Sequence, residues 1–114
     1  MDVSIGIMAY NEEKNIGRLL AALISQKTKA CKIKEIIVVD DCSTDKTKEI
    51  VRSFARKNRK IRLIANEQRK GKAHAINRFL KAAASPVLVL ESADTLPIRN
   101  AIENLCGPLK NPKF

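Results

Sequence analysis

Residues 36–44, with the sequence IIVVDDCST, decide how the rest of the chain can fold. The four β-favouring apolar residues 36–39 are typical of a strand that is covered on both faces. Asp40 and Asp41 follow at its carboxyl end, where open α/β sheets bind their ligands. Because adjacent carboxylates repel each other, we expect a hydrogen-bond donor, a metal ion or a basic side chain to compensate them.

Segments with strand and helix periodicity alternate along the whole chain. Short β-rich runs predict strands at residues 3–8, 35–39, 61–65 and 87–90, the last of them buried. Apolar residues at helical spacing predict helices at about residues 12–26, 45–56, 73–84 and 98–106. Such alternation implies a Rossmann-like three-layer α/β/α architecture with a mostly parallel sheet. Asn11 is expected to cap the first helix, and Ser43, Thr44 or Asp45 the second.

Length and composition limit the classes of protein. The 114 residues fit one domain, which we predict to span residues 1–114. A formal net charge of +10 suits a solvated lysine-rich surface, and also attraction to a diphosphate, a polyanion or an anionic membrane. The three cysteines lack C-x-x-C spacing, which argues against a disulfide framework or zinc site and favours a cytoplasmic compartment.

Two common phosphate-binding motifs, GxGxxG and GxxxxGK[ST], do not occur in this sequence. Instead, polar loops follow the predicted strands at residues 10–12, 40–41 and 91–94, and a basic loop lies at residues 69–72. Because parallel strands end on one edge of the sheet, these loops should converge on one crevice. A nucleoside diphosphate suits such a crevice, since carboxylates accept from base and ribose or hold a metal, and basic residues cover phosphates.

Four segments resemble the motifs of family 2 glycosyltransferases with the GT-A fold, in the family's order and spacing. They are VSIGIMAYNEEKNIGRLL at residues 3–20, IIVVDDCSTDKT at 36–47, RKGKAHAIN at 69–77 and VLVLESADTLP at 87–97. The last segment stands where the family has its D-x-D metal motif. The resemblance covers the chain to about Leu105 and implies the nucleotide-sugar-binding half of a GT-A transferase.

The resemblance implies roles around the nucleoside. Ala9 and Tyr10 would line the nucleobase, Tyr10 against its ring, and Glu12 would sit beside the nucleoside. Asp41 would accept a hydrogen bond from the base, while Asp40 would support the loop. The alternatives are that Tyr10 is an ordinary partly buried aromatic and that the two aspartates only cap a helix.

The resemblance also implies a site for the diphosphate and a divalent metal. Arg69 and Lys72 would lie near the diphosphate, and Asp94 would hold Mg²⁺ or Mn²⁺. Ser92 replaces the first aspartate of D-x-D and is expected to bind a ribose hydroxyl or a metal-bound water. Glu91, one residue earlier on the strand, is expected to point to the opposite face.

Two other departures from the family pattern concern the loops. Met8 stands where the family usually has proline, which is expected to loosen the first loop. Cys42 stands in place of the glycine that usually follows the two aspartates. If that position requires a positive φ, the cysteine side chain costs strain there.

Three functions are compatible with these features. The first is transfer of a sugar from a UDP-sugar or GDP-mannose to an unknown acceptor, or the donor-binding part of that reaction. The second is an inactive nucleotide-binding or scaffold module, and the least favoured is a basic nucleic-acid-binding protein. The family's acceptor half and usual catalytic base are not found, so whether this chain alone is an enzyme stays open. We expect a missing carboxyl-terminal half or self-association through an open sheet edge, and contact with the cytoplasmic membrane face.

Overall fold

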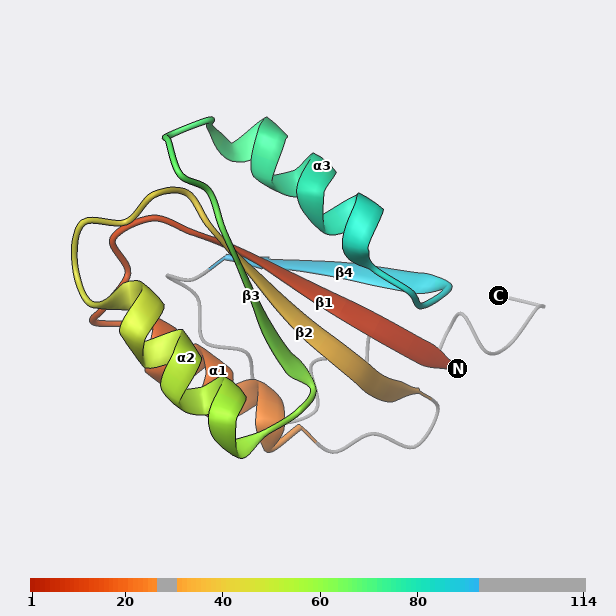
Figure 1. Ribbon diagram of the computed structural model, residues 1–114. Helices are drawn as coiled ribbons and strands as arrows, with labels where there is room; N and C mark the ends of the chain where they lie inside the picture. The colour runs from red at the N-terminus through yellow and green to blue at the C-terminus, as the bar shows by residue number, and fades with distance from the viewer. Residues whose placement is uncertain (27–30, 93–114) are drawn as a thin grey trace.

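The computed structural model describes residues 1–26 and 31–92, which form one parallel sheet with helices on both faces (Figure 1). The four strands have the order β3-β2-β1-β4. Figure 1 shows α1 and α2 on one face of the sheet and α3 on the other, which confirms the predicted α/β class. The elements are β1 (Asp2–Ala9), α1 (Ile16–Ile24), β2 (Lys32–Asp40), α2 (Thr47–Lys57), β3 (Ile61–Ala65), α3 (Lys72–Ala82) and β4 (Val87–Ser92).

The strand order creates a crevice at one edge of the sheet. The chain adds β2 and β3 on one side of β1, and α3 then carries it back so that β4 pairs with the other side of β1. At such a reversal of strand order, the loops that leave the neighbouring strands turn apart and leave room for a ligand at the carboxyl ends. The fold therefore predicts a site beyond β1, β2 and β4.

Side-chain alternation along the strands builds two cores. On the face covered by α1 and α2, Ile5, Ile7 and Val38 are fully buried. On the other face, Ile37 and Phe79 belong to a smaller core beneath α3. β2 is thus covered on both sides, as its continuous apolar run predicts.

Gly6 of β1 is where α3 approaches the sheet most closely. A Cβ atom at this position would lie 2.6 Å from two carbons of the Phe79 ring. Real Cβ atoms do not approach ring carbons so closely, so the fully buried ring occupies the place of the missing side chain. Glycine at this position sets the distance between α3 and the sheet.

A buried carboxylate joins the chain at the amino ends of the strands. Glu35 of β2 accepts hydrogen bonds from the Ser4 hydroxyl of β1 (2.6 Å), the Ala84 N–H before β4 (2.7 Å) and the Arg62 guanidinium of β3 (3.2 Å). Burial raises the pKa of Glu35, but these hydrogen bonds and the positive charge of Arg62 outweigh burial and lower the pKa below its usual value. The carboxylate therefore stays charged and fixes the end of the sheet opposite the crevice.

The first helix begins later than its sequence predicts. α1 starts at Ile16, and residues 12–15 form a turn in which the Glu12 carbonyl accepts from the N–H groups of Asn15 and Ile16. Asn11 does not cap this helix. It has a φ of 50°, and its side-chain oxygen accepts from the Thr44 N–H, 2.8 Å away. The prediction was wrong because Asn11 bonds across to the second loop.

The fourth strand is half-covered, whereas its sequence predicts a buried strand. Val87 and Val89 pack on the core beneath α1 and α2, but Leu88 and Leu90 are 40% and 50% exposed. α3 packs on β1 and β2, so it leaves this face of β4 open. Leu80 of α3, which the helical pattern places in the core, is also 47% exposed. The predicted helix at residues 98–106 lies outside the described residues.

Candidate functional site

A cavity of about 520 Å³ lies at the carboxyl ends of β1, β2 and β4, beside the first turns of α3. Its lining brings together six residues that the sequence analysis selects: Ala9, Tyr10, Glu12, Asp41, Arg69 and Lys72. The other lining residues are Met8, Ala75, Ile76, Leu90 and Glu91. An aromatic ring, three carboxylates and two cations thus share one mostly apolar cavity, a composition typical of small-molecule sites.

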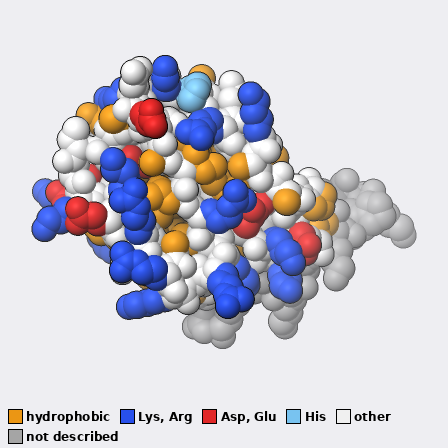
Figure 2. All heavy atoms as spheres, viewed as in Figure 1, with side chains coloured by type: hydrophobic (Ala, Val, Ile, Leu, Met, Phe, Trp, Pro, Cys, Tyr) orange, Lys and Arg blue, Asp and Glu red, His pale blue; other side chains and the backbone are white. Residues whose placement is uncertain are grey.

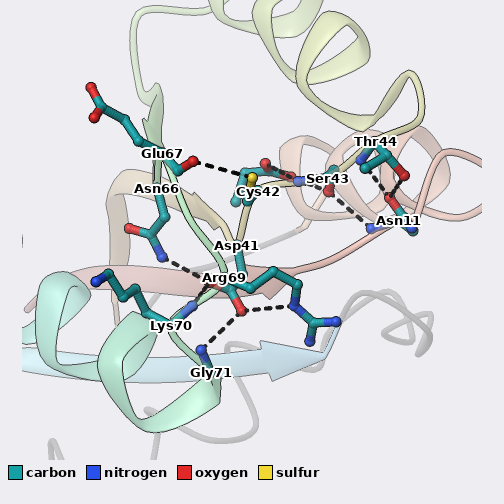
Figure 3. A network of polar contacts seen from close by, with 11 residues as sticks. Asn11, Asp41, Cys42, Ser43, Thr44, Asn66, Glu67, Arg69, Lys70 and Gly71 are labelled. Carbon is teal, nitrogen blue, oxygen red and sulfur yellow. Dashed lines mark hydrogen bonds and ion pairs between the residues drawn. The ribbon is translucent and has the colours of Figure 1, made fainter.

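Asp41 holds the loop between β3 and α3 in place (Figure 3). Its Oδ1 accepts from the Lys70 N–H (2.8 Å) and from Asn66 Nδ2 (3.1 Å). Its Oδ2 accepts from the Gly71 N–H (3.0 Å) and lies 3.5 Å from Arg69 Nε. Burial raises the pKa of Asp41, but these donors together lower the pKa to about 2. The carboxylate is therefore ionised at neutral pH and already engaged by the protein.

Asp40 lies beneath the site and does not line the cavity. It is fully buried, and its carboxylate accepts from the Ser43 N–H (2.9 Å) and from the Ser43 hydroxyl. Ser43 in turn accepts at its hydroxyl oxygen from the Asn11 N–H, 2.9 Å away. Asp40 thus ties the second loop to the first, and both adjacent carboxylates are compensated by donors from the protein itself.

Arg69 covers one face of the Tyr10 ring. Its guanidinium carbon lies 3.5 Å from the ring centroid, a close cation–π contact, and its Nε also faces Asp41. The sequence analysis expects Arg69 near a diphosphate, but here it lies where Tyr10 was expected to meet a base. A nucleobase can therefore stack on Tyr10 only at the opposite face of the ring or after the guanidinium has moved away.

Cys42, the residue after the two aspartates, does adopt the left-handed conformation, with a φ of 61°. This is the condition under which the sequence predicts strain, because a Cβ atom crowds the backbone at positive φ. The thiol donates to the Glu67 carbonyl over 3.4 Å, a long and weak hydrogen bond. That bond returns little of the cost.

Replacing Cys42 by glycine is expected to increase the free energy of unfolding by about 0.5–1 kcal/mol, because glycine adopts this φ without a Cβ clash. Urea denaturation of the two proteins measures the difference. Cys42→Ala is the matched control, since it removes the same weak hydrogen bond but keeps the Cβ atom, and it should give no gain. Equal stabilisation by alanine and glycine would show that the thiol, not the backbone, carries the strain.

The described residues do not by themselves form a metal site. Across residues 1–26 and 31–92 there is no cluster of three or more histidine, cysteine or acidic side chains. Ser92 is the last residue of β4 and pairs with Met8, and the predicted ligand Asp94 lies outside the described residues. Glu91, which strand alternation was expected to turn away, lines the cavity, and burial raises the pKa of its carboxyl.

Asn66 is a functional residue that the sequence analysis missed. It is 5% exposed and directly follows β3, whose last residue, Ala65, pairs with Asp40. In a parallel sheet, this register places the next residue beside Asp41, which Asn66 does contact. The signal was available, because an asparagine directly after a predicted strand has both a donor and an acceptor to offer at that edge.

Comparison with known proteins identifies this arrangement. The glycosyl transferase family 2 model matches residues 4–114. The glycosyltransferase AglE of Haloferax volcanii is 32% identical over 101 residues, which are 89% of this chain and 33% of AglE. Two solved structures also match. The mannosyltransferase PcManGT from Pyrobaculum calidifontis, in complex with GDP-Man and Mn²⁺, has a TM-score of 0.79 and 31% identity over 96% of this chain and 32% of its own. S. aureus TarS 1-349, in complex with UDP-GlcNAc, has a TM-score of 0.80 and 28% identity over 94% and 30%.

The chain thus spans about a third of each of these proteins. The family model, however, covers nearly all of it, and the parallel sheet with its edge cavity is the GT-A nucleotide-binding fold. The chain belongs to glycosyl transferase family 2.

Proposed function

We propose that this chain is the donor-binding part of a glycosyltransferase that moves a sugar from a nucleoside diphosphate to an acceptor. The observation that carries the proposal is the cavity at the carboxyl edge of the sheet, where Tyr10, Glu12, Asp41 and Lys72 meet. Family membership supports it, and so do PcManGT and TarS, which were solved with GDP-Man and UDP-GlcNAc. A UDP-sugar or GDP-mannose is the proposed donor.

Each end of the cavity suits one end of such a donor. Tyr10 offers an aromatic face for the base, and the Glu12 carboxylate can accept from a ribose hydroxyl. Lys72 begins α3, so its ammonium and the positive end of the helix dipole both favour phosphate there. Arg69 must exchange its contact with Tyr10 for one with the nucleotide, which makes it the residue that moves on binding.

The metal is the part of the proposal that rests on other evidence. PcManGT was solved with Mn²⁺, which supports a divalent cation in this family. We propose that Asp94 and the donor diphosphate hold Mg²⁺ or Mn²⁺, because the Asp41 carboxylate is already engaged by N–H donors. When bound, the cation would neutralise the diphosphate charge.

Titration calorimetry with UDP and GDP, each with and without Mn²⁺, tests this proposal. Saturable binding that strengthens at least tenfold with Mn²⁺ is expected, and Asp94→Ala should remove the Mn²⁺ effect. Glu49→Ala is the matched control, since it removes an exposed carboxylate from α2, away from the cavity, and should bind like the original protein. A folded sample that binds neither nucleotide would overturn the proposal.

An inactive nucleotide-binding module remains the second candidate function. The described residues supply no catalytic base of the kind that the family's other half carries, and Ser92 departs from the family's metal motif. Sugar transfer to added acceptors, measured in samples that bind nucleotide, separates the two functions. None of the described helices has the length and hydropathy to cross a membrane. A cytoplasmic location, contact with a membrane face and self-association stay predictions.

A further inference from the structure

A second cavity, of about 430 Å³, lies beside the loop that Asp41 holds. Residues of this loop line both cavities, with Arg69 at the first and Lys70 at the second. The other walls of the second cavity come from α3, through His74 and Arg78. Its volume lies in the range of sites for small molecules.

Basic side chains dominate this second cavity. His74 and Arg78 lie four residues apart, on the same side of α3, and Lys70 faces them from the loop. Among the described residues, no carboxylate forms an ion pair with any of the three. Figure 2 shows the single histidine of the chain among Lys and Arg side chains at the top of the molecule. An anion is the ligand that this charge favours.

Arg78 is held in position by a contact that leaves most of its donors available. One guanidinium nitrogen donates to Asn66 Oδ1 over 2.7 Å, and Asn66 Nδ2 donates to Asp41. This orientation of the Asn66 amide is fixed, because a guanidinium can only donate and a carboxylate can only accept. Asn66 is 95% buried by its 5% exposure, so Arg78 is anchored to the interior of the loop. An anchored guanidinium loses less freedom when it binds an anion.

We propose that the second cavity binds a phosphate monoester of a small polyol. Arg78, His74 and Lys70 would hold the phosphate, since a fork of guanidinium donors matches phosphate oxygens. Gln68 and Glu67 line the same cavity and can bond hydroxyl groups of the esterified part. In Figure 3 the Glu67 carboxylate points away from the Lys70 side chain, so it does not neutralise the phosphate end.

Calorimetric titration of the chain with glucose 6-phosphate at constant ionic strength tests this site. Saturable binding is expected, with no binding of free glucose and weaker binding of inorganic phosphate, which lacks the hydroxyl contacts. Arg78→Gln should weaken binding by roughly tenfold or more and His74→Gln by roughly threefold or more, because each removes a charged or polar donor. Lys81→Gln, in the last turn of α3 and absent from the cavity lining, removes the same charge as Arg78→Gln and should change nothing.

His74→Gln is the decisive variant, because Arg78→Gln also disturbs the contact with Asn66. The site is overturned if glucose 6-phosphate fails to bind the folded chain, or if both variants bind it like the original. It is also overturned if saturating UDP displaces the ester, which would place the phosphate in the first cavity. Equal affinity for inorganic phosphate overturns the ester part. Binding of the ester by a chain that does not bind UDP would keep this site and reject the proposed donor function.

Discussion

Replacing Gly6 by alanine is expected to lower the free energy of unfolding by about 3 kcal/mol, at the upper end of the usual cost of overpacking a core. The new methyl group would lie 2.6 Å from carbons of the Phe79 ring, which is fully buried and has no space to retreat. α3 would have to move away from β1, and the two lie close only at this point. Urea denaturation monitored by circular dichroism measures the loss.

A double-mutant cycle separates the clash from other effects. Gly6→Ala combined with Phe79→Ala should be about as stable as Phe79→Ala alone, because the truncated side chain no longer meets the new methyl group. Gly17→Ala is the matched control. Its Cβ would lie 3.5 Å from Ile50 and 3.7 Å from Phe54, which is ordinary contact, and alanine favours a helix. If Gly6→Ala costs no more than Gly17→Ala, α3 does not depend on this close approach.

Asp41→Asn is expected to weaken UDP binding by roughly thirtyfold or more and to destabilise the chain by about 2 kcal/mol, since hydrogen bonds to a charged group are lost. The amide would turn an NH₂ group toward N–H donors that now meet a carboxylate oxygen. The loop that carries Arg69 and Lys70 would lose its anchor, so the cavity would lose one wall. Calorimetry measures the affinity and urea denaturation the stability.

The same carboxylate predicts a dependence of stability on pH. The pKa of Asp41 falls from 3.8 when unfolded to about 2 in the fold, so its stabilisation is complete above about pH 4 and is lost as the pH falls toward 2. The difference in stability between the original chain and Asp41→Asn should therefore shrink between pH 4 and pH 2. A difference that stays constant over this range would show that the charge of Asp41 is not what stabilises the loop.

Asp45→Asn is the matched control for both measurements. Asp45 lies in the neighbouring loop, accepts from the N–H groups of Thr47 and Glu13, and does not line the cavity. Burial raises the pKa of Asp45, but its hydrogen bonds outweigh this and lower it, so the variant should also change stability in acid. It should keep UDP binding, and a loss as large as that of Asp41→Asn would contradict a specific role for Asp41.

The sequence predicts the sheet well because its strands are short apolar runs between clear breaks. The run at residues 36–39 indicates a strand covered on both faces, and β2 is such a strand. The start of α1 could not be predicted in the same way. Asn11 and Glu12 favour a helix locally, but their N–H groups donate to Ser43 and Thr47, more than 30 residues away. Tertiary contacts therefore decide where the helix begins.

The site shows the same division between register and loop geometry. Parallel strands must bring Tyr10 and Asp41 to one edge, so a pattern of strands is enough to place them together. The position of Arg69 depends on how the loop before α3 folds around the Asp41 carboxylate, with Gly71 at a φ of 91°. No local pattern in the sequence encodes that path, and so Arg69 lies on Tyr10 and not at the predicted diphosphate position.

The buried carboxylate of Glu35 also constrains the order in which the chain can assemble. Its donors Arg62, Ser4 and Ala84 are 27, 31 and 49 residues away along the chain. A charge without these donors would be costly to bury, so that end of the sheet can close only after β1, β2 and β3 have met and the turn before β4 has docked. Leu90 and Glu91 of β4 are walls of the nucleotide cavity. The binding site is therefore completed in the last step of folding, and a nascent chain that has not yet docked β4 has no nucleotide cavity to fill.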